Sequence, residues 1–532
     1  MANKRIKLIT IPWDLEVPTL SLASLAAVTP PQIDVAIVDA LRERIVWDEP
    51  VDLVGLSAST PAINRAYTIA DRFREMGVKV VIGGHHSTAM PDEALQHCDA
   101  VICGEGETSW MRLCDELLTN PSKIGGVYHD PAPDLGTLPQ PRVDLMKIER
   151  YGSFFYPLIA SRGCPESCTF CFSKRMTRGF RTYPISHILE QVRRRPSFIN
   201  AGYFVDDNLC ADLDFARELF KELKKLKFPF GIQARASFGE SMDDLKLARE
   251  AGCTLMSSGY ESVNQASLKG TGKRTIATDY KQLISNINAA GIIASGNWMF
   301  GFDWDTPAAF AETIEFIDST DLGHCSFTSE IPFPGTATFK RYEREGRILT
   351  YDYDRYSGKD EVVFKPKGMT AEELAGGIRW ITHQFYSTRR ATRRLKKAMS
   401  AGTLGGVAPK GLRGPALAWL NYSQAAWWRV QLMPRVMKVR KKLMPLHLLK
   451  HPTDLLKGTN FWGTNHRQAV PSPEKGAEVF ETKSPFLFEQ GLKPSRTRPL
   501  KVAPGVVTEL PTALEAEGPV SKADTVPHPA VP

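Results

Sequence analysis

Short apolar runs that alternate with helical stretches constrain the fold of this 532-residue chain more than any other sequence feature. In residues 1–145 the runs with strand character are 6–10, 34–38, 53–57, 78–82 and 100–103, and 63–76 is typical of a helix between two of them. Such alternation indicates a parallel sheet with helices on both faces. We therefore predict an α/β fold, with a doubly wound, Rossmann-like domain over residues 1–145.

The alternation continues through residues 146–345. The strand-like runs of this segment are 155–160, 202–205, 230–234, 254–258, 292–300 and 325–329. Stretches with helical character, such as 213–226 and 242–251, separate them. Six strand–helix units predict a partial (βα)6 barrel of the TIM type, in which the chemistry is expected at the carboxyl ends of the strands.

Three cysteines follow the first strand of this predicted barrel. Cys164, Cys168 and Cys171 have the spacing Cys-x3-Cys-x2-Cys. Three thiolates on one short loop can bind three irons of a [4Fe–4S] cluster and leave the fourth iron open to a small molecule. The alternatives are a zinc knuckle, which would need a fourth protein ligand, and three buried thiols.

The cysteine spacing resembles the cluster motif of the radical S-adenosylmethionine (SAM) superfamily. The resemblance implies that the amino and carboxylate groups of SAM occupy the open iron. It also implies that an electron from the cluster splits SAM into methionine and a 5′-deoxyadenosyl radical. The partial barrel expected over residues 146–345 agrees with the core of that superfamily.

Polar residues and glycines recur around the ends of the predicted barrel strands. The resemblance implies SAM contacts from Asp206, Asp207, Glu261, Ser262, Gly296 and Gly301. The two aspartates would bind the SAM amino group, the Glu-Ser pair its ribose and carboxylate, and the glycines would lie beside its adenine. The alternative for each Asp or Ser is a helix N-cap, which these residues favour regardless of function.

The first domain resembles the cobalamin-binding Rossmann-like family, in which a Ser-x-Leu element precedes a Gly-Gly pair. Here Gly83 follows Ser57 by 26 residues. Glycine lets the backbone approach the nucleotide tail of cobalamin, since no Cβ is in the way. The cobalamin contacts implied by this resemblance are Ser57, Ser59, Gly83, Gly84 and His85. The alternative is a flavodoxin-like domain that only packs.

One element departs from the cobalamin-binding family. There an Asp-x-His-x-x-Gly element supplies a histidine to cobalt, whereas this chain has Asp14 followed by Glu16 at the histidine position. We therefore expect that no histidine of this loop binds cobalt. Cobalamin-dependent radical SAM proteins commonly lack that histidine as well.

The remainder of the chain divides into two predicted segments. Residues 346–460 are expected to be mainly helical, and Thr370 with Glu373 has the pattern of a capping box. Residues 332–336, 345–349 and 364–373 resemble the region after the core in the subgroup that contains hopanoid C-2 methylases. Residues 461–532 are rich in Pro, Lys, Glu and Thr without periodicity and are expected to be a disordered tail.

Composition restricts the location of the protein. Six further cysteines are scattered through ordinary contexts, which suits a reducing cytoplasm and not a disulfide scaffold. No signal peptide is visible, and no apolar run of about 18 residues suggests a spanning helix. We expect a cytoplasmic protein, with peripheral contact at the inner face of the membrane as a further expectation.

Together these resemblances imply a cobalamin-dependent radical SAM enzyme with a [4Fe–4S] cluster, SAM and cobalamin. The expected reaction is transfer of a methyl group from SAM, by way of methylcobalamin, to an unactivated carbon of a small-molecule or lipid substrate. The alternatives are an oxidative cyclase or rearrangement enzyme and an iron–sulfur protein without turnover. A low-potential donor such as flavodoxin or ferredoxin is the expected partner. Nucleic acid is not expected, because no nucleic-acid module is visible.

Residues 416–443 carry three tryptophans among many basic side chains, a composition that suits an interfacial helix on anionic lipid. Each basic residue near such a surface contributes on the order of 1 kcal/mol. We predict sedimentation of the protein with anionic liposomes and release by salt, because the Debye length falls from about 10 Å at 0.1 M to about 3 Å at 1 M. Equal recovery in the supernatant with neutral and anionic liposomes would instead favour a solvated basic face.

Overall fold

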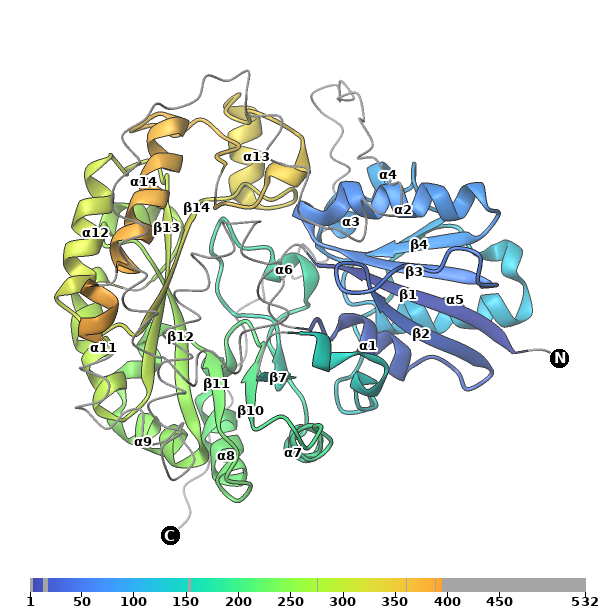
Figure 1. Cartoon of the computed structure of the whole chain (residues 1–532), viewed down its shortest axis with the longest axis horizontal. Coiled ribbons are helices and arrows are strands. Elements are labelled where there is room, and N and C mark those ends of the chain that lie inside the picture. Colours follow the sequence, from blue (N-terminus) through green and yellow to red (C-terminus); the bar gives the residue numbers. More distant parts are fainter. Residues whose placement is uncertain are drawn as a thin grey trace, which may run out of the picture. The chain divides into compact units, whose positions relative to one another are not determined.

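The computed structural model of the chain describes residues 3–12, 18–151, 155–274, 276–359, 361–387 and 389–394 (Figure 1). The predictions for Glu16, for the basic segment 416–443 and for the tail 461–532 lie outside these residues. Within the described part of the chain, no helix is both long and apolar enough to cross a membrane.

The first sheet has six strands, all parallel, in the order β2-β1-β3-β4-β5-β6. Their bounds are β1 Lys4–Ile11, β2 Ile33–Asp39, β3 Leu53–Ala58, β4 Lys79–Gly83, β5 Ala100–Ile102 and β6 Gly126–Tyr128. The predicted doubly wound sheet is confirmed. The edge strand β6 goes beyond the five predicted strands, since three residues are too short for a recognisable period.

Helices cover both faces of this sheet, as alternation along β1 requires. The helices are α1 Ser21–Ala27, α2 Ile63–Glu75, α3 His85–Ala89, α4 Pro91–Ala94 and α5 Glu107–Thr119. Leu8 points to the face covered by α1 and α5, where Trp110 is buried. Ile9, the next residue, points to the face covered by α2, where Phe73 is buried. Successive side chains of a strand alternate between faces, which explains the two apolar clusters.

The second sheet is also parallel throughout, and its strands follow the order β14-β13-β12-β11-β10-β7 (Figure 1). The bounds are β7 Phe155–Leu158, β10 Ala201–Phe204, β11 Phe230–Gln233, β12 Cys253–Glu261, β13 Ile293–Phe300 and β14 His324–Ser329. Consecutive strands of the barrel segment are therefore neighbours. This is the open, six-stranded arrangement that the sequence predicts for the second domain.

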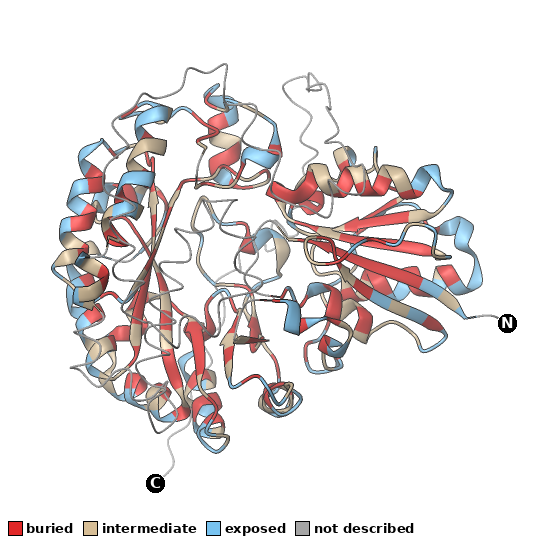
Figure 2. Cartoon of the chain, viewed as in Figure 1, coloured by how far each residue is buried: buried red, intermediate tan, exposed pale blue. Residues whose placement is uncertain are grey.

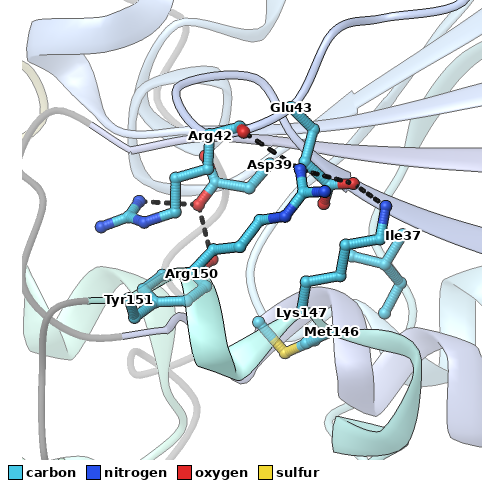
Figure 3. A pocket seen from close by; sticks show the side chains of 8 residues that line it. All are labelled: Ile37, Asp39, Arg42, Glu43, Met146, Lys147, Arg150 and Tyr151. Carbon is cyan, nitrogen blue, oxygen red and sulfur yellow. Dashed lines mark hydrogen bonds and ion pairs between the residues drawn. The ribbon is translucent and has the colours of Figure 1, made fainter. Parts of the chain in front are cut away.

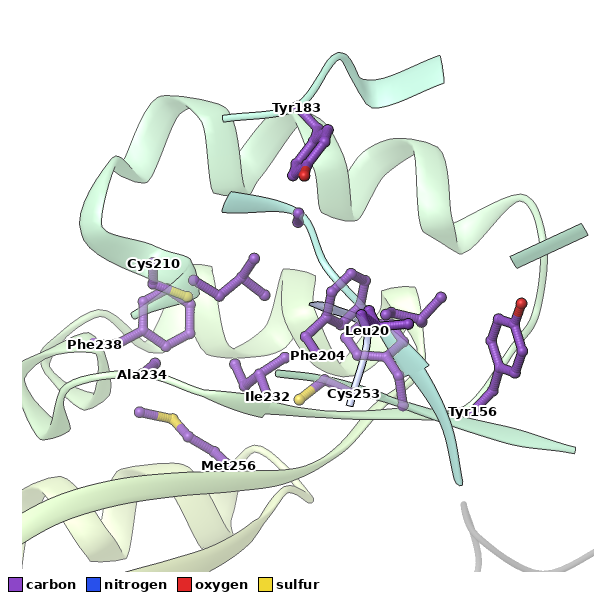
Figure 4. Packing of buried hydrophobic residues seen from close by; sticks show 14 of the residues in the cluster. Leu20, Tyr156, Tyr183, Phe204, Cys210, Ile232, Ala234, Phe238, Cys253 and Met256 are labelled. Atoms are coloured by element: carbon purple, nitrogen blue, oxygen red, sulfur yellow. The ribbon is translucent and has the colours of Figure 1, made fainter. Parts of the chain in front are cut away.

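The helices between these strands pack on one face of the sheet. They are α7 Ile185–Arg193, α8 Leu213–Lys224, α9 Met242–Ala251, α10 Gln265–Gly270, α11 Tyr280–Ala289 and α12 Ala308–Asp318. Phe204, Ile232 and Met256 are buried in this layer (Figure 4). The strands of this sheet contain only buried and half-buried residues, whereas the helices also have exposed positions (Figure 2).

Local signals begin and end these helices. The Asp212 carboxylate accepts hydrogen bonds from the backbone N–H groups of Asp214 and Phe215 at the start of α8. At the end of α9, Gly252 adopts φ +112°, where an added Cβ would approach the Phe228 carbonyl oxygen to 2.4 Å. Only glycine fits such a left-handed C-terminal position without strain.

Within the described residues, β14 is followed by the helices α13 Ala337–Arg344 and α14 Ala371–Phe385, among others. The capping box of Thr370 and Glu373 is confirmed at the start of α14. Between the two helices the chain returns to the first domain, where Tyr353 and Tyr356 join the apolar cluster that contains Phe73. We name residues 350–359 the return segment. It connects the part of the chain between α13 and α14 to the first domain.

Packing of the return segment predicts a measurable contribution to stability. Tyr356 is fully buried, and its hydroxyl donates a 2.7 Å hydrogen bond to the Thr350 carbonyl. We expect Tyr356→Ala to lower the free energy of unfolding by about 3–5 kcal/mol, because it leaves a cavity of ring size. Urea unfolding of the apoprotein is the measurement.

The matched control is Tyr351→Ala in the same segment, because Tyr351 is 50 % exposed. Its effect should stay within about 0.5 kcal/mol. Equal destabilisation by both substitutions would contradict the buried role of Tyr356.

Candidate functional site

The three cysteines lie in a loop that a short antiparallel hairpin closes. Strand β8 Ser161–Arg162 pairs with β9 Arg181–Thr182, and α6 Ser173–Met176 lies between them. Cys164 and Cys168 are half-buried, and Cys171 is exposed. Gly163, with φ +84°, lies so close to the other end of the hairpin that an added Cβ would meet the Gly179 carbonyl oxygen at 2.2 Å. Glycine is therefore required directly before Cys164.

Hydrogen bonds from the barrel hold the middle of this cysteine loop. The Thr169 backbone N–H donates to the Thr271 carbonyl at 3.0 Å. The Thr169 carbonyl accepts from the Thr338 backbone N–H of α13, also at 3.0 Å. Thr169, one of the two residues between Cys168 and Cys171, is thus fixed from two sides, by the end of α10 and by the segment after β14.

The cysteine thiols suit a positively charged ligand. Desolvation of the thiol by the surrounding loop, together with charge repulsion from Asp207, Cys168 and Cys164, raises the pKa of Cys171 to about 11. Burial also raises the pKa values of Cys164 and Cys168. Three adjacent thiolates would repel one another, whereas a cation bound among them removes that penalty. The donor set therefore fits an iron–sulfur cluster.

Among the described residues, no three His, Cys, Asp or Glu side chains converge closely enough to hold a single metal ion. Ligands of a [4Fe–4S] cluster bind separate irons, so they need not converge on one point. His187 follows the cysteines in sequence, but it stacks on Tyr183 at a centroid distance of 5.0 Å. The described residues therefore do not place these cysteines and His187 as ligands of a single metal ion.

The two aspartates after β10 have different surroundings. Asp206 is 1 % exposed, and its carboxylate accepts hydrogen bonds from the Ala160 N–H at 3.1 Å, from the Ser161 hydroxyl at 2.5 Å and from the Ser161 N–H. Burial raises the pKa of Asp206 to about 7. Asp207 is exposed and accepts a 2.5 Å bond from Ser173, beside Cys171. Asp206 thus supports the start of the loop, and Asp207 is the better candidate for a SAM contact.

Glu261 is one of two described non-glycine residues with positive φ, at +62°. Its carboxylate accepts a 2.8 Å hydrogen bond from Lys273, which also donates to the Gly259 carbonyl. Strained backbone of this kind concentrates at ligand sites, and it lies here at a register shift between β12 and β13. The Ser262 hydroxyl accepts a hydrogen bond from the Asn264 N–H and so stabilises a turn.

Lys273 was not among the residues that the sequence singles out. It lies close enough to Cys168 to lower the pKa of that thiol against the effect of burial. No spacing pattern marks a lysine in a loop after α10. Only the ion pair with Glu261 reveals its place beside the cysteines.

Gly296 lies in β13 and Gly301 directly follows it, and each position requires glycine for a different structural reason. At Gly296 an added Cβ would meet the indole nitrogen of Trp298 at 2.8 Å, so this glycine makes room for a buried ring. Gly301 ends the strand with φ +97°, and its N–H donates to the Asp305 carboxylate at 3.0 Å. Gly301 therefore forms the turn at the carboxyl end of β13, where a ligand of the barrel would bind.

The residues expected to contact cobalamin converge at the carboxyl edge between β3 and β4. Ser57 and Gly83 are register partners, and Ser59 follows β3 half-exposed. Gly84 has φ +111°, and an added Cβ would approach the Ala58 carbonyl oxygen to 2.5 Å. His85 is exposed at the start of α3. The edge is thus a cradle of small residues, which fits the approach of a large ligand to backbone.

His85 also connects this edge to the cysteine loop. Its ring meets Phe172, the residue after Cys171, edge to face at a centroid distance of 5.4 Å. The neighbouring His86 is buried and occupied on both ring nitrogens, by Glu93 at 3.0 Å and Thr60 at 3.4 Å. His86 therefore supports the loops behind the edge.

A hollow beside β2 is lined by none of the residues of the cysteine loop or of the β3–β4 edge (Figure 3). Its lining side chains bond to one another: Arg42 pairs with Asp39 at 2.8 Å, and the Tyr151 hydroxyl donates to the same carboxylate at 2.5 Å. The candidate site is therefore the region of the cysteine loop and the β3–β4 edge.

Family models match both regions. The model of the B12 binding domain matches residues 6–113, which contain the β3–β4 edge. The model of the radical SAM superfamily matches residues 158–317, which contain the cysteine loop and the strand ends of the barrel.

Relatives and solved structures agree with both matches. Bacteriochlorophyllide d C-8(2)-methyltransferase of Chlorobaculum tepidum is 28 % identical to this chain, over 65 % of this chain and 80 % of its own length. Hopanoid C-2 methylase of Rhodopseudomonas palustris is 25 % identical, over 64 % of this chain and 67 % of its own length.

The radical enzyme OxsB, solved with aqua-cobalamin and S-adenosylmethionine bound, has the same fold at 16 % identity. The TM-score is 0.57, and the match covers 86 % of this chain and 75 % of OxsB. The order of the two family matches, the cysteine loop and the cradle between β3 and β4 all agree. The chain therefore combines a B12 binding domain with a radical SAM core, and it is a cobalamin-dependent radical SAM enzyme that uses a [4Fe–4S] cluster, SAM and cobalamin.

Proposed function

We propose that this enzyme transfers a methyl group from SAM, by way of cobalamin, to an unactivated carbon of a biosynthetic intermediate. The observation that carries the proposal is the contact between His85 and Phe172, at 5.4 Å, because it joins the cobalamin edge to the cysteine loop. A radical methyl transfer needs both cofactors to reach one substrate carbon. The names of the two relatives, a bacteriochlorophyllide methyltransferase and a hopanoid methylase, support the same reaction.

The cofactors supply the difficult chemistry when bound, and the residues of this chain position SAM. Asp207 is the proposed partner of the SAM ammonium group, because an exposed carboxylate beside Cys171 can form a charge-assisted hydrogen bond. The Glu261–Lys273 pair offers a carboxylate to the ribose hydroxyls and an ammonium to the SAM carboxylate. The turn at Gly301 is proposed to lie near the adenine.

The barrel favours a substrate with hydrogen-bonding groups. Tyr203, Gln233, Ser257 and Asn297 are half-buried and alternate with the apolar residues that face the helices. Gln233 and Ser257 are register partners, and the Asn297 amide donates to the Ser257 hydroxyl at 3.2 Å. Neutral donors and acceptors on the inner face suit an uncharged polar region of a substrate better than a plain hydrocarbon. Either a small molecule or a functionalised lipid meets this requirement.

The enzyme also needs an external reductant, for which we propose a low-potential flavodoxin or ferredoxin. The cysteine loop is partly exposed to solvent: Cys164 and Cys168 are half-buried, and Cys171 is exposed. Exposure of the loop is compatible with electron delivery to the cluster from a docked protein.

Isotope tracing tests the methyl transfer. Cells with and without the gene are fed methionine labelled as CD3, and their metabolites are compared by mass spectrometry. We expect a gene-dependent product that carries the intact CD3 group. The control is a Cys171→Ala enzyme, which should yield neither this product nor 5′-deoxyadenosine, because one iron loses its ligand.

Two results would replace the proposal. A gene-dependent product without deuterium, formed together with 5′-deoxyadenosine, would indicate the cyclase or rearrangement reaction. Absence of 5′-deoxyadenosine from the reduced, reconstituted enzyme with SAM would indicate a protein without turnover.

We further predict that no protein histidine binds cobalt. Glu16 occupies the histidine position of the cobalamin-binding element, and His86 is occupied by Glu93 and Thr60. Electron paramagnetic resonance of the cob(II)alamin form should therefore show no axial nitrogen splitting that depends on a protein histidine. The His85→Ala enzyme is the control and should give the same spectrum. Nitrogen splitting that disappears in this variant would identify His85 as a ligand and refute the prediction.

A further inference from the structure

Four charged side chains connect the cobalamin-binding domain to the hairpin that carries the cysteines. Arg162 donates to Glu105 at 2.9 Å and to Glu107 at 2.6 Å, and Arg181 also pairs with Glu105. We name these residues, Glu105, Glu107, Arg162 and Arg181, the interdomain clamp. The two glutamate side chains are 5 % and 6 % exposed, and that of Arg162 is 11 % exposed.

Burial restricts the side chains of the interdomain clamp to their ion pairs. Two carboxylates and two guanidinium groups balance in charge, so none of the four is left without an opposite partner. Loss of one partner leaves an uncompensated charge in a poorly hydrated place, which is strongly unfavourable. Arg162 also lies near the ring of Tyr183, 5.6 Å from its centroid. The planar guanidinium can bind two carboxylates and contact one aromatic ring at the same time, whereas the ammonium group of lysine cannot.

Both ends of the clamp lie next to a cofactor site. Glu105 and Glu107 follow β5, at the same carboxyl edge as Ser57 and Gly83. The loop begins with Gly104, whose N–H donates to the Thr88 hydroxyl of α3 at 3.0 Å. The helix that begins with His85 is therefore bonded to the loop that carries Glu105 and leads into α5 at Glu107.

At the other end, Arg162 stands two residues before Cys164. Its neighbour Ser161 is held by the buried carboxylate of Asp206, within the barrel. Consecutive residues are thus tied to different domains: Ser161 to the barrel and Arg162 to the cobalamin-binding domain. Gly163 then turns the chain into the cluster loop.

We propose that Arg162 is a positioning residue that sets the separation between cobalamin and the [4Fe–4S] cluster. It does so by holding the Cys164 end of the cluster loop against the carboxyl edge that carries cobalamin. Radical chemistry shared by two cofactors depends on this separation, because a displacement of about 1 Å in a reacting group can cost about 100-fold in rate.

Magnetic relaxation tests the proposal without a substrate. The enzyme is reconstituted with iron, sulfide and cobalamin, and the spin relaxation of cob(II)alamin is measured with the cluster oxidised and with the cluster reduced. A reduced cluster is paramagnetic and speeds this relaxation by an amount that falls steeply with distance. We expect a clear enhancement in the wild-type enzyme and loss of most of it in Arg162→Met at equal iron and cobalamin content.

Two further variants make the test decisive. Arg217→Met is the matched control, because it removes an arginine–carboxylate pair of similar length, 2.7 Å to Asp244, on the helical layer of the barrel. It should keep the wild-type enhancement. If Arg162→Met does not take up its cluster, Glu107→Gln replaces it, since Arg162 then keeps its bond to Glu105. Wild-type enhancement in Arg162→Met, or in Glu107→Gln where that variant decides, would overturn the proposal.

Discussion

The candidate cofactor sites of this protein depend on one geometric constraint: parallel strands of a sheet all end at the same edge. In the first sheet this edge brings Ser57 next to Gly83, although 26 residues separate them. In the second sheet the loops after β10 and β13 reach the cysteine loop through the Asp207–Ser173 hydrogen bond and the Phe302–Phe170 ring contact. Lys273, which follows β12 and α10, lies close to Cys168. The contact of His85 with Phe172 joins the two sets of loops. Residues far apart in the sequence therefore contribute to one region of chemistry.

Buried charge gives this region its rigidity. Asp206 lies within the barrel and accepts three hydrogen bonds from the segment that leads into the cluster loop. Arg162, on the same segment, pairs with two buried glutamates of the other domain. Polar networks of this kind are costly unless every member has a partner, and they then specify one arrangement. The start of the cluster loop is accordingly the most constrained part of the site.

Much of the fold follows from patterns within short stretches of sequence. The strands of both sheets were predictable, since a buried parallel strand is a continuous apolar run between polar turns. The cysteine loop and the capping box of Thr370 and Glu373 were predictable for the same local reason. Strand β6 and the return segment with Tyr356 were not. Three residues have no period, and burial of a tyrosine against another domain has no local signal.

The sequence by itself determined which residue types stand at the strand ends, because those residues are neighbours of recognisable strands. Asp206 and Asp207 both follow β10, and no local pattern distinguishes them. Only the tertiary structure decided that the first is buried against Ser161 while the second remains exposed beside Ser173. The same holds for Lys273, whose partner Glu261 comes from another element. Which side chain supports a site and which can meet a ligand depends on partners that folding brings from elsewhere in the chain.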